Sequence, residues 1–278
     1  FHTAKDGGKF VNLDMEEYHD LHLTIEVFKR ILDRPEFTDL KAGIVLQAYL
    51  PDAMDAMVDV QDWAAGRVAN GGAPVKVRLV KGANLPMERV DAALHGWTLA
   101  VQPSKAATDA NYIRMLEYAL RPEHIKNVEL GIAGQNLFTL AFGLELAKAR
   151  GITDGYDIEM LKGMATNQAL AIREDVGQIL YYVPVVDPKN YDVAISYLVR
   201  RLEESSAPEN FMSGVFEIAE DDSVFARERN RFTTGVVGAF PHSNVAEALA
   251  PVDDDVPSLH FGPNRSQNRS TEEIAKLD

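Results

Sequence analysis

Short apolar runs and longer helical patterns alternate along most of the chain. The runs have the length and composition of buried strands, and the stretches between them carry apolar residues three or four positions apart, as amphipathic helices do. The predicted strands are Phe10–Leu13, Gly43–Tyr49, Val75–Val80, Val128–Ile132, Tyr156–Leu161 and Ile179–Val185, with a weaker seventh at Leu99–Gln102. The predicted helices are Tyr18–Leu32, Met54–Ala69, Met87–Trp97, Asn111–Leu120, Leu137–Arg150, Gln168–Asp175 and Tyr191–Glu204.

Strand followed by helix, repeated in this way, predicts an α/β protein with a parallel sheet. Seven such units favour a (βα)8 barrel of the TIM type over an open doubly wound sheet. The open sheet would usually carry G-x-G-x-x-G after its first strand, and neither this motif nor a Walker A loop occurs in the sequence. A closed barrel needs eight strands. Because the chain begins almost directly on a strand, we expect residues 1–218 to form strands two to eight, with the first strand missing.

The composition changes after about Phe216. Residues 219–278 are acidic and then rich in Gly, Pro and Asn, with aspartate at positions 253, 254 and 255. This composition is typical of a linker, or of an edge that belongs to another domain. Within it, Thr234–Phe240 has the pattern of one short strand.

Charge and cysteine usage exclude several classes of function. Lys and Arg number 28 and Asp and Glu number 42, which gives a net charge of −14. This acidity argues against a nucleic-acid partner, which selects a basic surface. The chain has no cysteine, which excludes disulfides, thiolate metal sites and a cysteine nucleophile. No apolar run approaches the ~18 residues of a membrane-spanning helix, and these features together fit a protein of the cytoplasm.

In a parallel barrel the active site lies at the carboxyl ends of the strands, so the residues that follow each apolar run are the candidates. Asp14 could orient a ligand, or it could cap a helix together with Glu17 three residues on. The amide of Gln47 suits the edge of a heteroaromatic ring, or it meets water at the rim. Gln135 and Asn136 begin a helix, where backbone N–H groups could hold phosphate or the residues could form a plain cap.

Arg78 is the most informative candidate because it lies inside an apolar strand, where an unpaired charge is costly. It should meet an anion, a ring atom that gains negative charge, or a structural carboxylate inside the barrel. Gly82 and Ala83 follow, and both allow a backbone to approach a ligand closely. Thr108 and Asp109 have the pattern of a helix start.

The last predicted helix carries a polar stripe. Tyr197, Arg200, Arg201 and Glu204 fall on one face, opposite an apolar face. Two adjacent guanidinium groups beside a phenol form a suitable clamp for a small carboxylate. An ordinary solvated helix face would have the same periodicity.

Several segments together resemble the proline dehydrogenase domain of the bifunctional proline utilization A flavoenzymes. They are Asn12-Leu13-Asp14-Met15-Glu16-Glu17, Leu46-Gln47-Ala48-Tyr49, Arg78-Leu79-Val80-Lys81-Gly82-Ala83, Leu161-Lys162-Gly163-Met164 and Tyr197-Leu198-Val199-Arg200-Arg201-Leu202-Glu203-Glu204. They occur in the order of the family and cover about residues 8–216, so the chain resembles an internal fragment of such an enzyme.

The resemblance implies a (βα)8 barrel that holds FAD and oxidises L-proline to Δ1-pyrroline-5-carboxylate, the first step of proline catabolism. A hydride passes from proline C5 to flavin N5, and the electrons pass to a membrane quinone. It also implies a cytoplasmic enzyme, or one held peripherally at the inner membrane. Two alternatives stay open: a flavin barrel that acts on another cyclic imino acid such as hydroxyproline, and a non-catalytic fragment that serves as an assembly scaffold.

The same resemblance implies roles for individual residues. Those at the substrate are Arg200 and Arg201 as the carboxylate clamp, Tyr197 beside the ring, Asp14 and Tyr182 at one side of the pocket, and Leu161 between flavin and substrate. Those at the cofactor are Arg78 near flavin N5, Gln47 at the isoalloxazine edge, Lys81, Gly82, Ala83 and Asn136 along the cofactor, and Glu204 and Phe211 near the final helix.

The chain departs from the family at a few points. Asn84 and Gln135, both at cofactor contacts, stand where many members have Tyr and His. The family's first strand, with a substrate-binding lysine, is missing, and so is the aldehyde dehydrogenase domain. We expect residues 219–278 to be the linker toward that domain.

Overall fold

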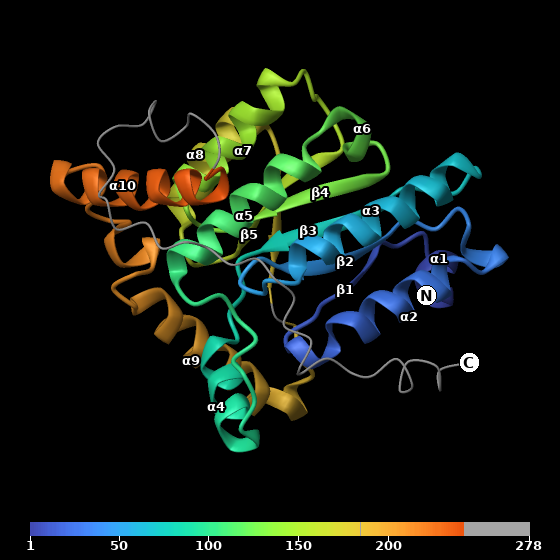
Figure 1. Ribbon diagram of the computed structural model, residues 1–278, viewed down its shortest axis with the longest axis horizontal. Helices are drawn as coiled ribbons and strands as arrows, with labels where there is room; N and C mark the ends of the chain where they lie inside the picture. Colours follow the sequence, from blue (N-terminus) through green and yellow to red (C-terminus); the bar gives the residue numbers. More distant parts are fainter. Residues whose placement is uncertain (184, 242–278) are drawn as a thin grey trace.

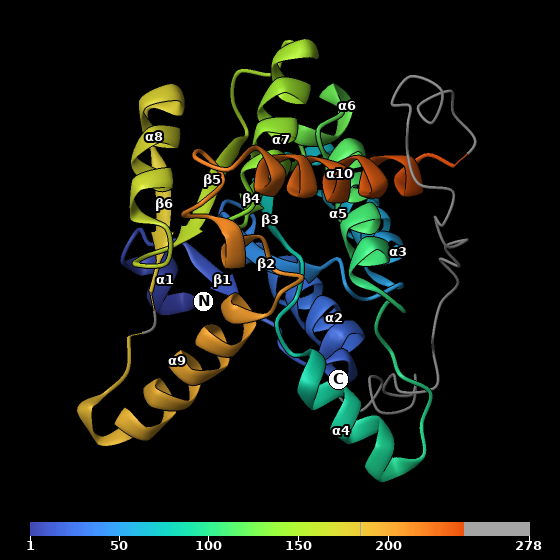
Figure 2. The same cartoon turned by 90° about the vertical axis from the view of Figure 1, so that its left-hand side faces the viewer.

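The computed structural model describes residues 1–183 and 185–241 and contains one parallel sheet that curls around its inner face (Figures 1 and 2). Each strand pairs with the strand that precedes it along the chain. The six strands are β1 (Val11–Leu13), β2 (Ala42–Gln47), β3 (Val75–Val80), β4 (Val128–Ala133), β5 (Tyr156–Leu161) and β6 (Ile179–Tyr182). Because all neighbours run parallel, their carboxyl ends meet at one end of the sheet.

The described residues form ten helices, and some of them cover the outer face of the sheet (Figure 1). They are α1 (His2–Asp6), α2 (Leu21–Leu32), α3 (Ala53–Ala69), α4 (Leu85–His95), α5 (Lys105–Ala119), α6 (Pro122–Ile125), α7 (Leu137–Ala149), α8 (Thr166–Val176), α9 (Tyr191–Ser206) and α10 (Asp222–Ala239). Short 3₁₀ turns are η1 (Tyr18–Asp20), η2 (Pro35–Phe37), η3 (Pro188–Asn190) and η4 (Phe211–Gly214). Side-chain caps fix the starts of α5, at Ser104, and of α7, at Asn136.

The hydrophobic core lies between the outer face of the sheet and the helices. Strand side chains alternate between the two faces. The outward residues of the central strands are almost fully buried: Ile44, Leu46, Val75, Val77, Leu79, Leu130 and Ile132. Phe28 of α2 and Met115 and Leu116 of α5 belong to the same core. The other alternate positions face inward, where the sheet carries most of its charged residues.

The predicted count of seven strands is wrong, because Leu99–Gln102 is not a strand. This segment is an irregular connection whose Ala100 and Val101 are buried in the core, and the backbone N–H of Gln102 donates to the carbonyl oxygen of Tyr49 at 2.6 Å. The described sheet is therefore a curled half-barrel with open edges at β1 and β6. An eight-stranded barrel would need two further strands, where the sequence suggested one.

The strand predicted at Thr234–Phe240 is also wrong, because residues 222–239 form α10. This helix packs on α5 through a small apolar cluster that includes Ala110, Ile113 and Ala239. A Cβ atom at Gly235 would lie 3.3 Å from the Cδ1 atom of Ile113, so glycine allows the two helices to approach closely. The first part of the predicted linker thus contains a helix that packs on the helical layer, and residues 242–278 lie outside the described residues.

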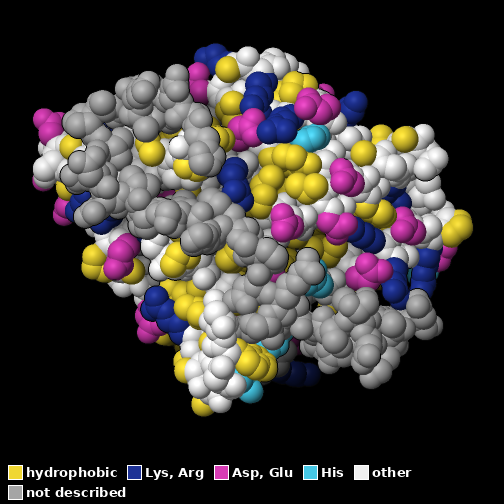
Figure 3. All heavy atoms as spheres, viewed as in Figure 1, with side chains coloured by type: hydrophobic (Ala, Val, Ile, Leu, Met, Phe, Trp, Pro, Cys, Tyr) yellow, Lys and Arg dark blue, Asp and Glu magenta, His cyan; other side chains and the backbone are white. Residues whose placement is uncertain are grey.

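The surface is acidic overall without a gathering of one sign on the face that Figure 3 shows, where Lys and Arg side chains are interspersed with Asp and Glu. Among the described residues, no helix combines the length and apolar character that crossing a membrane requires.

Candidate functional site

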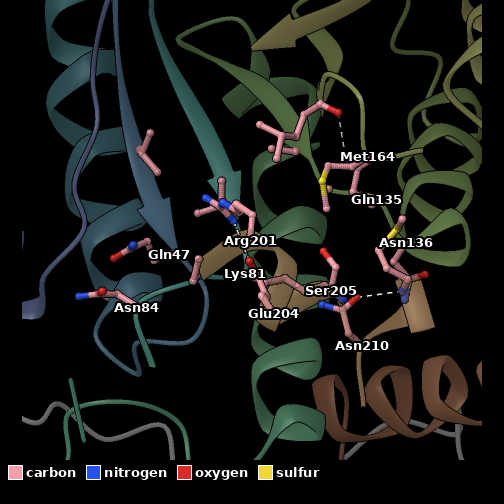
Figure 4. Close-up of a pocket in the computed structure, with 18 of the residues that line it drawn as sticks. Gln47, Lys81, Asn84, Gln135, Asn136, Met164, Arg201, Glu204, Ser205 and Asn210 are labelled. Carbon is pink, nitrogen blue, oxygen red and sulfur yellow. Dashed lines mark hydrogen bonds and ion pairs between the residues drawn. The ribbon is translucent and has the colours of Figure 1, made fainter. Parts of the chain in front are cut away.

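One cavity of about 280 Å³ lies at the carboxyl ends of the strands, and all sixteen residues that the resemblance assigns to the substrate or the cofactor line it. From the strands and their following loops come Asp14, Gln47, Arg78, Lys81, Gly82, Ala83, Asn84, Gln135, Asn136, Leu161 and Tyr182; from α9 and η4 come Tyr197, Arg200, Arg201, Glu204 and Phe211. In Figure 4, Arg201, Lys81 and Glu204 lie centrally, with Gln47 on one side and Asn136 on the other. Their convergence is a finding, while the role of each residue stays a prediction.

Helix α9 turns its polar stripe toward the cavity. The guanidinium carbon of Arg201 lies 5.2 Å from the centre of the Tyr197 ring, and its Nη1 atom lies 2.8 Å from a carboxylate oxygen of Glu204. Arg200 Nη1 lies 3.6 Å from Oε2 of Glu16. The opposite, apolar face is about half exposed, with Leu198 at 53%. Of the two interpretations that periodicity left open, the structure therefore favours a polar stripe that lines a cavity over a simple solvated face.

A row of alternating charges crosses the inner face of the sheet, from Asp157 through Lys76, Glu159 and Arg78 to Asp14. We call these five residues the charged row. Lys76 Nζ lies 2.7 Å from Asp157 and 2.7 Å from Glu159. Arg78 donates from Nε to Glu159 and from Nη1 to Asp14, the latter at 2.9 Å. Arg78 thus has the structural carboxylate that its place in an apolar strand called for, and it also lines the cavity.

The charged row can form because β4, which lies between β3 and β5, carries no side chain at the point where the row crosses it. Arg78 of β3 is in register with Gly131 of β4, and Gly131 with Asp157 of β5. A Cβ atom at position 131 would lie 2.0 Å from Oε1 of Glu159 and 3.2 Å from Cε of Lys76. Glycine at this position is therefore a condition for the buried charge pairs.

The surroundings of these groups favour the charged form of the arginines, whereas burial raises the pKa of Asp157 at the end of the charged row. Burial disfavours the charged form of Arg78, but Glu159 and Asp14 outweigh it and raise the pKa of the guanidinium. The same balance, with Glu204 as the principal partner, raises the pKa of Arg201. Burial raises the pKa of Tyr182 to about 12 although both arginines oppose this shift, so Tyr182 remains a neutral phenol near pH 7.

A second charge cluster lies at the α5 end of the cavity. Asp109 accepts hydrogen bonds from Lys81 at 2.5 Å and from Lys105 at 2.6 Å. Burial opposes its charge, but the two lysines prevail and lower the pKa of Asp109, whereas burial lowers the pKa of Lys81. One carboxylate between two lysines leaves a net positive charge beside the cavity, which suits a phosphate.

Asp109 lies inside α5 rather than at its start, and Lys105 is a site residue that was not predicted. Helix α5 begins at Lys105 and is capped by Ser104, so the helix start predicted at Thr108 and Asp109 is wrong. The i, i+4 spacing of Lys105 and Asp109 was the available signal. Asp14 likewise does not cap the following 3₁₀ turn, whose N-cap position is Glu17.

Two glutamines that line the cavity have a buried amide oxygen without a hydrogen-bond partner among the described residues. These oxygens are Oε1 of Gln47 and Oε1 of Gln135. The Gln135 amide nitrogen donates to the carbonyl oxygen of Leu161 at 3.2 Å, which fixes the amide. Side-chain amides at the lining of a cavity can both donate to and accept from the edge of a flat heteroaromatic ring. No cluster of potential metal ligands occurs in the described ranges.

The sequence model of one family, proline dehydrogenase, matches residues 1–214. The chain belongs to the proline dehydrogenase family. Its half-barrel superposes on proline utilization A (PutA) from Corynebacterium freiburgense with a TM-score of 0.74 and 49% identity, over 84% of this chain and 22% of that one. The predicted resemblance is thereby confirmed, and the family consists of oxidoreductases that are in general flavin-dependent.

The chain is also similar to two curated proteins of different description. The bifunctional protein PutA of Klebsiella aerogenes is 26% identical over 74% of this chain, which spans 16% of that protein's length. The hydroxyproline dehydrogenase of Rattus norvegicus is 33% identical over 57% of this chain and 34% of its own length.

Replacing Gly131 by Ala should destabilise the protein, because the new methyl group must displace Glu159 or Lys76. We expect a loss of about 2 kcal/mol or more in the free energy of unfolding, measured by urea titration. Gly134→Ala is the matched control: its added Cβ meets no atom within 4 Å, so it should change stability by less than about 0.5 kcal/mol. Equal effects of the two substitutions would contradict the requirement for glycine at position 131 of β4.

Asp109→Asn should lose stability in a pH-dependent way. The pKa of Asp109 is lowered in the folded state, so its contribution is complete above the unfolded pKa of about 3.9 and disappears as the pH falls through the folded value. Urea titrations of both proteins between pH 7 and pH 3 should show the stability difference shrinking below about pH 4. A difference that stays constant over this range would mean that the charge of Asp109 is not what stabilises the cluster.

Proposed function

We propose that this chain is the substrate-oxidising part of an FAD-dependent proline dehydrogenase, which converts L-proline to Δ1-pyrroline-5-carboxylate. The observation that carries the proposal is the convergence of an arginine pair, a neutral phenol and two glutamine amides on one cavity, in a chain of this family. When bound, FAD would supply the hydride acceptor for C5 of proline. The protein then has to bind and orient proline and to keep water out.

The α9 stripe supplies the substrate clamp. Arg200 and Arg201 would take the two carboxylate oxygens of proline, and Tyr197 would pack beside its ring. Arg201 is held by Glu204, so its guanidinium is oriented before the substrate arrives. On the other side, Leu161 and the neutral phenol of Tyr182 would close the pocket against water.

The remaining residues suit the cofactor. The amides of Gln47 and Gln135 would meet the edge of the ring, and Arg78 would stabilise negative charge that develops on the reduced ring. Lys81 and Lys105, which share Asp109, would hold the phosphates. Also along the cofactor we place Gly82, Ala83, Asn84, Asn136, Glu204 and Phe211, all of which line the cavity.

We further propose that the half-barrel is part of a closed (βα)8 barrel with residues 1–218 as its larger portion. Both edges of the sheet carry apolar side chains on the inner face, Phe10 at 47% exposure beside β1 and Leu180 at 40% on β6. Closed parallel barrels bury such residues and leave no edge. Residues 219–278 would lead toward an aldehyde dehydrogenase domain, and electrons would pass to a quinone from the cytoplasm or at the inner membrane.

A second candidate is oxidation of hydroxyproline, favoured by the similarity to the rat enzyme. The same clamp would bind either carboxylate. The ratio of kcat/KM for the two imino acids separates the candidates, and absence of flavin would leave only a scaffold role.

Arg201→Met should weaken proline oxidation because a charged bidentate contact is lost. In the natural full-length protein we expect a flavin spectrum that proline bleaches, and for the variant a loss of about 2–4 kcal/mol, roughly 30- to 1000-fold in kcat/KM, mostly through KM. Flavin content should stay close to that of the parent. The matched control is Arg89→Met on the exposed side of α4. A variant within twofold of the parent would refute the clamp.

Barrel closure predicts slow amide hydrogen exchange at both sheet edges. In the natural full-length protein, peptides that contain β1 and β6 should be protected almost as well as those of β3, because closed strands have no solvated edge. Fast exchange confined to β1 and β6 would mean that the sheet stays open.

A further inference from the structure

Glu159 is a buried carboxylate that does not line the cavity and that no part of the proposed mechanism uses. It lies at the centre of the charged row with 1% of its side chain exposed. Its two oxygens are divided between two cations: Oε1 lies 2.7 Å from Lys76 Nζ, and Oε2 accepts from Arg78 Nε. A carboxylate at this depth costs several kcal/mol to desolvate, so its partners must hold it charged.

The division of the two oxygens fixes the orientation of Arg78. A guanidinium is planar, and a hydrogen bond at Nε anchors its inner edge, which turns the terminal nitrogens away from Glu159. One of them, Nη1, reaches Asp14 at the cavity. The ring of Tyr182 lies 4.9 Å from the guanidinium carbon and supports its face. Glu159 therefore determines which side of Arg78 a ligand in the cavity meets.

Glu159 also determines how much positive charge Arg78 presents. Three carboxylates contact the two cations of the charged row, but Asp14 is 71% exposed and Asp157 is 41% exposed. Water screens their charges, whereas the charge of Glu159 acts at short range in a medium of low polarity. Of the three, Glu159 offsets the field of Arg78 most strongly.

We propose that Glu159 is a positioning residue that orients Arg78 toward the flavin. The negative charge of Glu159 also offsets that of Arg78, and through this offset it lowers the affinity of the oxidised flavin site for anions and for electrons. The inference rests on the proposed function. It assigns the tuning of the cofactor to a residue behind the cavity wall rather than to one that touches the ligand.

The test is Glu159→Gln in the flavin-loaded, full-length protein, with sulfite as the probe. Sulfite adds reversibly to the oxidised ring of flavins and leaves it negatively charged, so its Kd reports the local field. Removing the charge of Glu159 should lower the sulfite Kd by about tenfold, and the midpoint potential should rise by about 30 mV, the equivalent of tenfold for a two-electron couple. Sulfite titration of the flavin absorbance and spectroelectrochemistry measure the two quantities.

Three further variants separate charge from structure. Lys76→Met leaves Glu159 to Arg78 alone and should raise the sulfite Kd, the opposite sign, and it keeps the test decisive if Glu159→Gln does not fold. Combining both substitutions restores the net charge and should return the Kd toward that of the parent. Asp157→Asn removes a partly exposed carboxylate and should change the Kd less than threefold.

The outcomes are distinguishable. A sulfite Kd within twofold of the parent in Glu159→Gln, or shifts of the same sign in Glu159→Gln and Lys76→Met, would overturn the inference while the proposed function stands. A parent protein that holds no flavin would overturn the proposed function itself.

Discussion

The site depends on one constraint: charged side chains on the inner face of a curled sheet must meet countercharges across a neighbouring strand. Arg78 and Glu159 come from strands that do not pair with each other, and β4 lies between them. Only a strand without a side chain at Gly131 lets them touch. The contact between Arg78 and Glu159 therefore requires glycine at position 131 as well as the carboxylate itself.

Pairs of a cation and a supporting carboxylate also occur elsewhere around the cavity. Arg201 is held by Glu204, and Lys81 and Lys105 are held by Asp109. Each cation that faces the cavity has a carboxylate behind or beside it, which favours its charged form and limits its motion before a ligand arrives. Preorganised charges of this kind avoid the reorganisation that a flexible lysine or arginine would need on binding.

Sequence patterns predicted the positions of the six strands because each is an apolar run flanked by helical periodicity, and they placed the candidate residues at the ends of those runs. Sequence patterns gave wrong predictions where tertiary packing, and not local periodicity, determines the structure of a segment. Ala100 and Val101 are apolar because an irregular connection crosses the core, and a short apolar run does not distinguish this from a strand. Gly235 looked like part of a strand or loop, yet it is the point where α10 lies closest to α5.

Contacts between residues far apart in the sequence could not be predicted, for a different reason. The pattern around Arg78 required some anion, but nothing local identifies Glu159, which follows it by 81 positions. Likewise, the polar stripe of α9 had the periodicity of a solvated face. Only the placement of the helix over the strand ends distinguishes a clamp from a surface.

The sheet is assembled from neighbours in sequence, and this has a consequence for biosynthesis. Every strand pairs with the one translated just before it, so the sheet can grow by addition at one edge while the chain emerges from the ribosome. The arginine pair of α9 is translated after all six strands. In a nascent chain, the strand ends of the cavity can therefore form before Arg200 and Arg201 are added.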